Sequence, residues 1–231
     1  MITQIDEAKK CLTYVREYRQ NIIFMRELIL QSNECVEEFN NTHEGHAFNF
    51  ILNTLHARMV VDLRKILEPS TGDKNNNIDS LVKFIRNNKE MLAQKHYDDF
   101  HNTPTQHFGS INPANNPETK DFFDNIKKKH ARKEAKECSD KIDVTVKRWD
   151  KVWKLLGQKA FDIKTARTTI VHSTILDDGM MPSLNKIKKL LYIATYFIKN
   201  INFIIDNTCY DFKSEQKVCQ EIAETFWKRI Q

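Results

Sequence analysis

Glycine and proline are scarce in this chain, with only five of each among 231 residues. An all-β fold needs many tight turns, which glycine and proline usually supply. The scarcity therefore favours long helices. The sequence also contains no glycine-rich phosphate loop, and its most apolar run, residues 190–198, is far shorter than the ~20 residues of a membrane span. We expect an all-α protein without membrane contact.

The five cysteines are odd in number, scattered and never in a C-x-x-C pair. This pattern is typical of reduced thiols in a cytosol rather than of a secreted disulfide framework. The first ten residues carry polar interruptions and no apolar core, so they do not resemble a signal peptide. We expect a cytoplasmic protein.

Histidines occur in two groups, but neither has the ligands of a zinc site nearby. The groups are His43 with His46, and His96 with His101 and His107. A structural zinc ion needs about four ligands, and no cysteine lies near either group in sequence. Nor do the carboxylates form a convincing cluster for a divalent metal. We therefore expect no metal and no cofactor.

Apolar residues recur at steps of three and four between the few loops, which predicts helices. We expect a single helical domain over 1–231, with loops at about 68–77 and 102–117. The expected helices cover residues 5–29, 48–66, 79–92, 122–156, a short segment after Gly157 that holds Arg167 and His172, 184–207 and 218–230. The sequence does not decide whether the longest segment, 122–156, is one helix or is divided into two near Ser139. The helix over 184–207 is apolar on more than one face, so it is central or lies at a subunit interface.

Arg167 and His172 form the candidate chemical site. Arginine is a permanent cation and histidine exchanges protons near neutral pH, a combination that suits metal-independent cleavage of RNA. Five helical positions place the two side chains about 140° apart. Both would border one cleft only if the helix ended near His172, or if a second copy supplied the missing groups.

The segment Lys164-Thr-Ala-Arg-Thr-Thr-Ile-Val-His-Ser173 resembles the R-x4-6-H signature of the HEPN superfamily. The segment His56-Ala-Arg-Met-Val-Val-Asp-Leu-Arg-Lys-Ile-Leu67, with the polar loop and residues 78–85 after it, resembles the abortive-infection (AbiU-like) branch. The resemblance implies an antiparallel helical bundle of HEPN type with extra helices, a homodimer with facing motifs, and metal-independent RNase activity. It also implies a role in phage defence or in a toxin–antitoxin pair, with an antitoxin or a neighbouring defence protein as partner.

The chain departs from the HEPN pattern at two positions. Members commonly carry Asn, Asp or His directly after the arginine, where this chain has Thr168. A hydroxyl can still bond a phosphate or the histidine, so Thr168 is kept as an auxiliary catalytic residue. Many related toxins carry tyrosine two places after the histidine, where Thr174 stands here, so tyrosine AMPylation is not expected.

Two further sets of residues are candidates for RNA contact or for support of the site. The net charge is +5, and the densest basic run contains Lys127, Lys128, Lys129, Arg132 and Lys133. On a helix these side chains point several ways, so the run is either a phosphate-contacting stripe or an ordinary solvated surface. Arg58 and Asp62 stand four apart and can pair. They either form a structural pair or line the cleft and orient His172 or the phosphate.

Three functions stay open from the sequence. The leading one is a homodimeric endoribonuclease that acts on RNA. The second is a catalytically inactive helical module that binds RNA, a nucleotide or a partner protein. The third is a structural interaction protein whose helix at 184–207 docks onto another subunit. Trp149 and Trp153 share a face and are expected in the core or an interface rather than as a base-stacking platform.

Overall fold

A computed structural model of the chain describes residues 2–35, 39, 42–68, 76–103, 117–172 and 182–229. Over residues 155–172 it describes the backbone but not the side chains. The helices are α1 (Ile2–Gln31), the 3-10 turn η1 (Ser32–Glu34), α3 (His43–Leu67), α4 (Ile78–Asn87), α5 (Lys89–Asn102), α6 (Pro117–His172), α7 (Leu184–Asp206) and α8 (Phe212–Lys228). Within these residues there is no strand, so the expected all-α class is confirmed.

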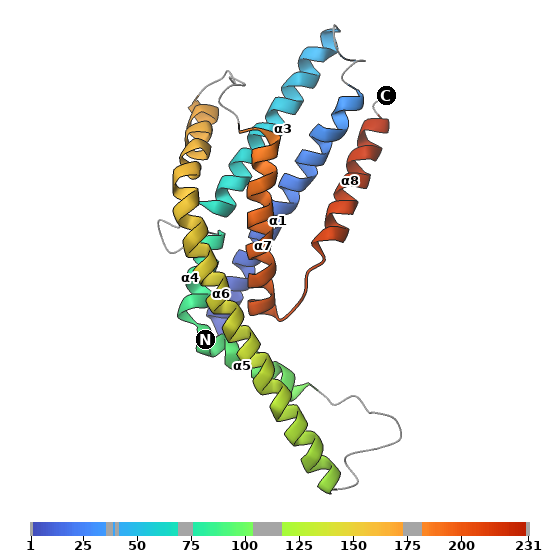
Figure 1. Ribbon diagram of the computed structural model, residues 1–231. Coiled ribbons are helices and arrows are strands. Elements are labelled where there is room, and N and C mark those ends of the chain that lie inside the picture. The colour runs from blue at the N-terminus through green and yellow to red at the C-terminus, as the bar shows by residue number, and fades with distance from the viewer. Residues whose placement is uncertain are drawn as a thin grey trace.

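The long helices run up and down beside one another, with α7 in the middle of the bundle (Figure 1). Helix α7 packs against α1, α3, α4 and α6 of the same chain. Its buried residues follow the apolar positions of the sequence: Ile187, Leu190, Leu191, Ala194, Phe197, Ile198, Ile201, Ile204 and Ile205. The breadth of its apolar surface is therefore explained by a central position within one chain.

Side chains that accept backbone N–H groups begin several of the helices. Thr42, Asn77 and Ser183 each accept from the residue three positions on, which caps α3, α4 and α7. Helix α7 ends where Asn207 adopts a left-handed conformation with φ of 53°, which asparagine tolerates better than most residues.

Helix α6 differs from the expected pattern because it is one helix of 56 residues rather than two. A break was expected at Gly157, with a separate short helix after it. Interior glycine costs about 1 kcal/mol and each β-branched residue a few tenths, but only proline removes a backbone hydrogen bond. No proline follows Pro117 within α6, so an existing helix propagates through both features. Conversely, the segment expected as one helix over 79–92 is divided into α4 and α5 at Asn88.

The first part of α6 and the end of α5 project beyond the bundle as a two-helix arm (Figure 1). The base of the arm is packed: Trp149 of α6 is fully buried, lies 4.9 Å from the ring of Phe197, and donates from Nε1 to Asp79 Oδ1 at 3.0 Å. Trp153 stacks on Trp149 and is partly buried, so the expected core role of both tryptophans is confirmed. None of the helices in the described ranges has a stretch apolar and long enough to cross a bilayer.

His96 of α5 joins the base of the arm to α7. It is fully buried, and its Nε2 donates to the carbonyl oxygen of Ile204 at 2.9 Å, while its Nδ1 has no hydrogen-bond partner. Burial lowers the pKa of His96 below its ordinary value, and nearby Lys95 lowers it further, against the opposing effects of the Ile204 carbonyl, Asp99 and Glu134. A proton on Nδ1 would have no acceptor in this apolar setting.

Acid should therefore weaken the fold through His96. Its folded pKa is depressed, so its contribution is present above the unfolded pKa of about 6.5 and is lost as pH falls through the window below that value. While only the unfolded state takes up the proton, unfolding becomes easier by about 1.4 kcal/mol per pH unit. Urea unfolding from pH 7.5 to 5 would measure this. In His96→Gln, which keeps a donor and cannot titrate, the slope should be smaller. An unchanged slope in that variant would contradict the assignment.

Candidate functional site at the end of the long helix

Arg167, Thr168 and His172 lie in the last two turns of α6, and His172 is its final residue. Their side chains lie outside the described part of the chain, so only the placement of their backbone is known. The continuous helix separates Arg167 and His172 by about 7.5 Å along the axis and about 140° around it. Helix α6 is described up to His172, and the residues that follow lie outside the described part of the chain, so a cleft shared by Arg167 and His172 stays a prediction.

The connection that follows α6 returns to the bundle at a defined point. The backbone is described again from Pro182, whose carbonyl oxygen lies 2.8 Å from Nε2 of His56 on α3. A carbonyl accepts, so His56 donates here. The start of α7 is thereby tied to α3, at the same end of the bundle as the end of α6 (Figure 1). His56, which begins the second segment of the HEPN resemblance, thus contacts the segment just before α7.

Arg58 and Asp62 pair as their spacing predicts, and Lys65 joins them. Arg58 Nε donates to Asp62 Oδ2 at 3.1 Å, and Lys65 Nζ donates to Oδ1 at 3.3 Å. The Asp62 side chain is 0% exposed, whereas that of Arg58 is 56% exposed. Lys65 also lies 4.7 Å from the centre of the Tyr18 ring on α1. The carboxylate is therefore held from both sides within α3, and its role in orienting His172 stays a prediction.

The basic run lies on the arm, and the structure sorts it into faces. Ala131 is fully buried against the arm's other helix, whereas Ile126 is 39% exposed. Lys127 is half-buried. Away from Ala131, exposed cations recur at three- and four-residue steps and form what we call the basic stripe: Lys129, Arg132, Lys133 and Lys136. Lys128 is exposed beside it. Lys136 was missed, although its spacing from Lys129 and Lys133 was readable.

A cleft of about 600 Å³ lies between α1, α7 and the start of α8. It was not predicted from the sequence. Cations and tyrosines line it, including Lys188, Tyr192, Tyr196 and Lys199 on α7. Its sequence signal is the recurrence of Lys and Tyr at steps of three and four on the one uncovered face of an otherwise apolar helix. We call it the tyrosine cleft.

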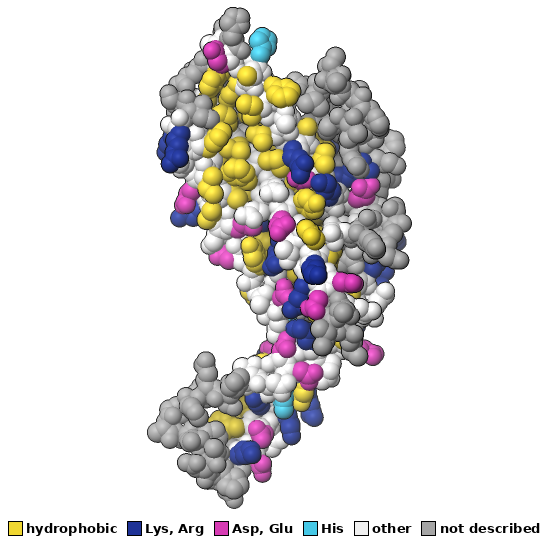
Figure 2. All heavy atoms as spheres, turned by 180° about the vertical axis from the view of Figure 1, so that it is seen from behind, with side chains coloured by type: hydrophobic (Ala, Val, Ile, Leu, Met, Phe, Trp, Pro, Cys, Tyr) yellow, Lys and Arg dark blue, Asp and Glu magenta, His cyan; other side chains and the backbone are white. Residues whose placement is uncertain are grey.

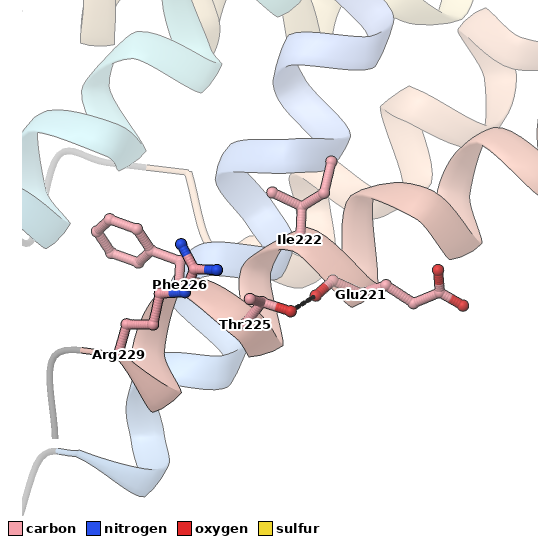
Figure 3. Close-up of a pocket in the computed structure, with 5 residues that line it drawn as sticks. All are labelled: Glu221, Ile222, Thr225, Phe226 and Arg229. Carbon is pink, nitrogen blue, oxygen red and sulfur yellow. Dashed lines mark hydrogen bonds between the residues drawn. The ribbon is translucent and has the colours of Figure 1, made fainter.

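A second hollow, of about 480 Å³, is lined among the described residues by α8 and by Arg229 just after it (Figure 3). Ile222 and Phe226 line it, with Arg229 beside Phe226 and Glu221 directed away. The hydroxyl of Thr225 donates to the backbone carbonyl oxygen of Glu221 at 2.8 Å. Hydrophobic side chains also gather on the upper part of the face opposite to that of Figure 1 (Figure 2). The exposed ones on α3 and α8 are Phe50, Ile51, Val218, Ile222 and Phe226. These surfaces offer contact area but no reactive groups.

Among the residues that the structure describes, the histidines and cysteines do not form a group with the geometry of metal ligands. His46 is exposed, His96 is used in the core, and His101 stacks on Tyr97 at 5.5 Å; His107 and the side chain of His43 lie outside the described residues. In the described ranges, no three His, Cys, Asp or Glu side chains form a group that could hold a metal. Burial raises the pKa of the Cys11 and Cys138 thiols to about 11, so neither is a nucleophile at neutral pH.

Comparisons of the chain with family models, curated proteins and solved structures found no match.

Removing the Asp62 carboxylate tests its structural role. Asp62 accepts two charged hydrogen bonds, each worth about 1.5–3 kcal/mol when buried, and the exposure of the two donors reduces their sum. Asp62→Ala should therefore lower the free energy of unfolding by about 2–3 kcal/mol in urea titrations. Asp150→Ala is the matched control, because Asp150 pairs with Arg86 where both side chains are about half exposed. The control should change stability by less than about 0.5 kcal/mol. Normal stability in Asp62→Ala would show that the carboxylate serves another purpose.

Proposed function

We propose that the protein is a metal-independent endoribonuclease of HEPN type, with Arg167 and His172 as its catalytic residues. The observation that supports the proposal is that the R-x4-H motif lies in the last described turns of a long helix in an all-helical bundle. The resemblance to the abortive-infection branch adds phage defence or a toxin–antitoxin pair as setting, with an antitoxin or neighbouring defence protein as the restraining partner.

The chemistry needs only proton transfer and charge stabilisation. The imidazole of His172 takes the proton of a ribose 2′-OH, and the 2′ oxygen attacks the adjacent phosphorus. The bond from phosphorus to the 5′ oxygen breaks, and a protonated imidazole gives its proton to that oxygen. The Arg167 guanidinium stabilises the charge that develops on the phosphate, with Thr168 as an auxiliary contact. The products are a 2′,3′-cyclic phosphate and a free 5′-OH.

A homodimer would supply both proton-transfer groups. One imidazole can act as base and the other as acid when two copies of the helix end meet over one phosphate. The angle of about 140° between Arg167 and His172 on one helix favours this arrangement, because the two side chains of one copy diverge. A composite site of this kind contains two arginines and two histidines.

The basic stripe lies far from the motif on the same helix. From Lys133 to Arg167 is 34 residues, or about 51 Å of helix. At about 3.4 Å per nucleotide along a helical strand, this distance corresponds to about 15 nucleotides. Only a long or folded RNA could contact both places in one protomer. The proposed substrate is therefore a structured RNA held by the arm and cut at the bundle.

Substitution of either motif residue should abolish cleavage without disturbing the fold. Purified protein incubated with total RNA in EDTA should generate cyclic-phosphate ends, and His172→Ala and Arg167→Ala should each reduce the rate by about 100-fold or more, the scale of a lost general base or charge stabiliser. Gel analysis and end-group phosphatase treatment measure the products.

Thr174→Ala is the matched control, since it removes a polar group two places beyond the histidine and should leave the rate within about twofold. An equimolar mixture of the unaltered protein and the His172→Ala variant tests the composite site, because a mixed dimer has only one of the two imidazoles, so the mixture should cleave more slowly than the unaltered protein diluted twofold. RNA binding without cleavage in the unaltered protein would replace the enzyme with the inactive binding module.

The arm is tested by a change in substrate preference. The triple variant Lys129→Ala/Arg132→Ala/Lys133→Ala should weaken binding of a structured RNA and reduce its salt slope by about 2, if each cation neutralises one phosphate. Cleavage of an oligonucleotide of about five nucleotides should be unaffected, because it cannot bridge the arm and the motif. The control removes three exposed lysines elsewhere: Lys10, Lys217 and Lys228. Equal losses in both triple variants would leave only a general charge effect.

A further inference from the structure

The tyrosine cleft carries more positive charge than its neighbours neutralise. Five cations and one carboxylate line it. Two of the cations are already paired, Arg19 with Glu215 and Arg26 with Glu27. The remaining three are Lys188, Lys199 and Lys213, and within the described part of the chain no ion pair is recorded for any of them. An anion entering the cleft would meet three ammonium groups.

Asp211 is the one carboxylate among the described residues that line the cleft, and it caps the start of α8. Asp211 Oδ1 accepts from the backbone N–H groups of Lys213 and Ser214, at 3.0 and 3.2 Å, and Oδ2 accepts from the Ser214 hydroxyl at 2.7 Å. These bonds cap α8 and lower the pKa of Asp211. The carboxylate therefore stays ionised and bound at the helix start, and the charge of Lys213 lowers its pKa further, so that three ammonium groups of the lining face this single capping carboxylate.

An exposed aromatic ring stands between two of these lysines. Tyr192 is 77% exposed although α7 is the central helix, and it lies one turn after Lys188 and two turns before Lys199. Packing does not require a ring at this position. Beside it, the hydroxyl of Tyr196 accepts from Arg148 of α6, which fixes that ring at the edge of the cleft. The cleft thus offers a free planar face together with ammonium groups.

The floor of the cleft is rigid. Arg19 is 3% exposed, donates from Nε to Thr195 Oγ1 at 2.8 Å, and pairs with Glu215 of α8. Its guanidinium lies 4.1 Å from the centre of the Phe212 ring. One side chain of α1 therefore joins α7 to α8 beneath the cleft. A ligand would enter a preformed site, which lowers the entropic cost of binding.

We propose that the tyrosine cleft binds a nucleotide, with its phosphates on Lys188, Lys199 and Lys213 and its base against the ring of Tyr192. The volume falls within the roughly 300–1,000 Å³ typical of small-molecule sites. Ammonium groups bind phosphate, and aromatic rings stack on bases of any sequence. The nucleotide is either free or one unit of a single strand. The inference does not rest on the endoribonuclease, because α7 lies between the cleft and the end of α6 (Figure 1).

Calorimetry with the full chain in EDTA would test the site. ATP should bind more tightly than AMP, and both more tightly than adenosine or inorganic phosphate, because each of the latter lacks one half of the recognition. Tyr192→Ala should weaken ATP binding about 5- to 100-fold, the effect of losing one stacked base. Tyr192→Trp should restore binding. Lys199→Ala should weaken ATP binding about 10-fold, as one lost charged hydrogen bond.

The control is Lys189→Ala, which removes the same charge from an exposed position next to Lys188 but outside the cleft lining. It should leave ATP binding within about twofold, as expected for a screened surface charge. A fluorescent single-stranded RNA, measured by anisotropy, separates the sources. Binding of the RNA but not of ATP or AMP, with the same loss in Tyr192→Ala, assigns the site to a strand.

Several outcomes would overturn the inference. Failure of ATP, AMP and the RNA to reach saturation would do so. So would inorganic phosphate binding as tightly as ATP, or equal losses in Lys189→Ala and Lys199→Ala. Failure of the endoribonuclease is distinguishable, because Arg167→Ala and His172→Ala should bind ATP normally in either case.

Discussion

Burial of α7 is the constraint on which the rest of the bundle depends. A helix apolar on most of its circumference is stable in water only when neighbours cover it on several sides, and α1, α3, α4 and α6 do so here. The polar groups of its surroundings are placed to permit that burial. Asn202 of α7 accepts from Arg16 at 2.9 Å and donates to the Thr208 carbonyl at 2.8 Å, and His96 satisfies the Ile204 carbonyl. Covering α7 therefore fixes the positions of α1 and of the arm together.

The second organising element is α6, because one uninterrupted helix connects two places that would otherwise be independent. Its 56 residues extend for about 84 Å, from the arm to the motif. The bundle packs against the middle of α6, where Trp149 contacts Phe197 and donates a hydrogen bond to Asp79. A bend at Gly157 would have made the orientation of Arg167 and His172 independent of the arm. The continuous backbone instead sets the relation between the basic stripe and the motif by helical geometry alone.

The sequence predicted the helices well wherever apolar periodicity was strong, as for α1, α3 and α7, because burying one face is the dominant energy term there. The prediction was wrong where the continuation or the end of a helix depended on local residue preferences of about 1 kcal/mol or less. Gly157 and the β-branched residues of 168–175 weaken a helix by amounts that cooperative propagation overcomes as far as His172, whereas Asn88 ends α4 without any glycine or proline. The tyrosine cleft was missed, and the basic run was predicted without the face that it presents, for another reason. Both depend on which face the neighbouring helices leave uncovered, and that is a tertiary property.

The charges of the lysines that line the cleft explain why it is not closed by a neighbouring helix. They also explain why α8 packs against α1 instead of α7. Moving α8 across the face of α7 would bury Lys188 and Lys199 beside Lys213, and desolvating unpaired ammonium groups costs several kcal/mol each. The Arg19–Glu215 pair and the Arg19–Phe212 contact hold α8 at the near side, where Cys219, Ala223 and Trp227 are buried. The same three lysines that prevent closure are thus the groups that an anionic ligand would neutralise. An anion that binds these lysines in the folded protein but not in the unfolded chain would therefore raise the free energy of unfolding.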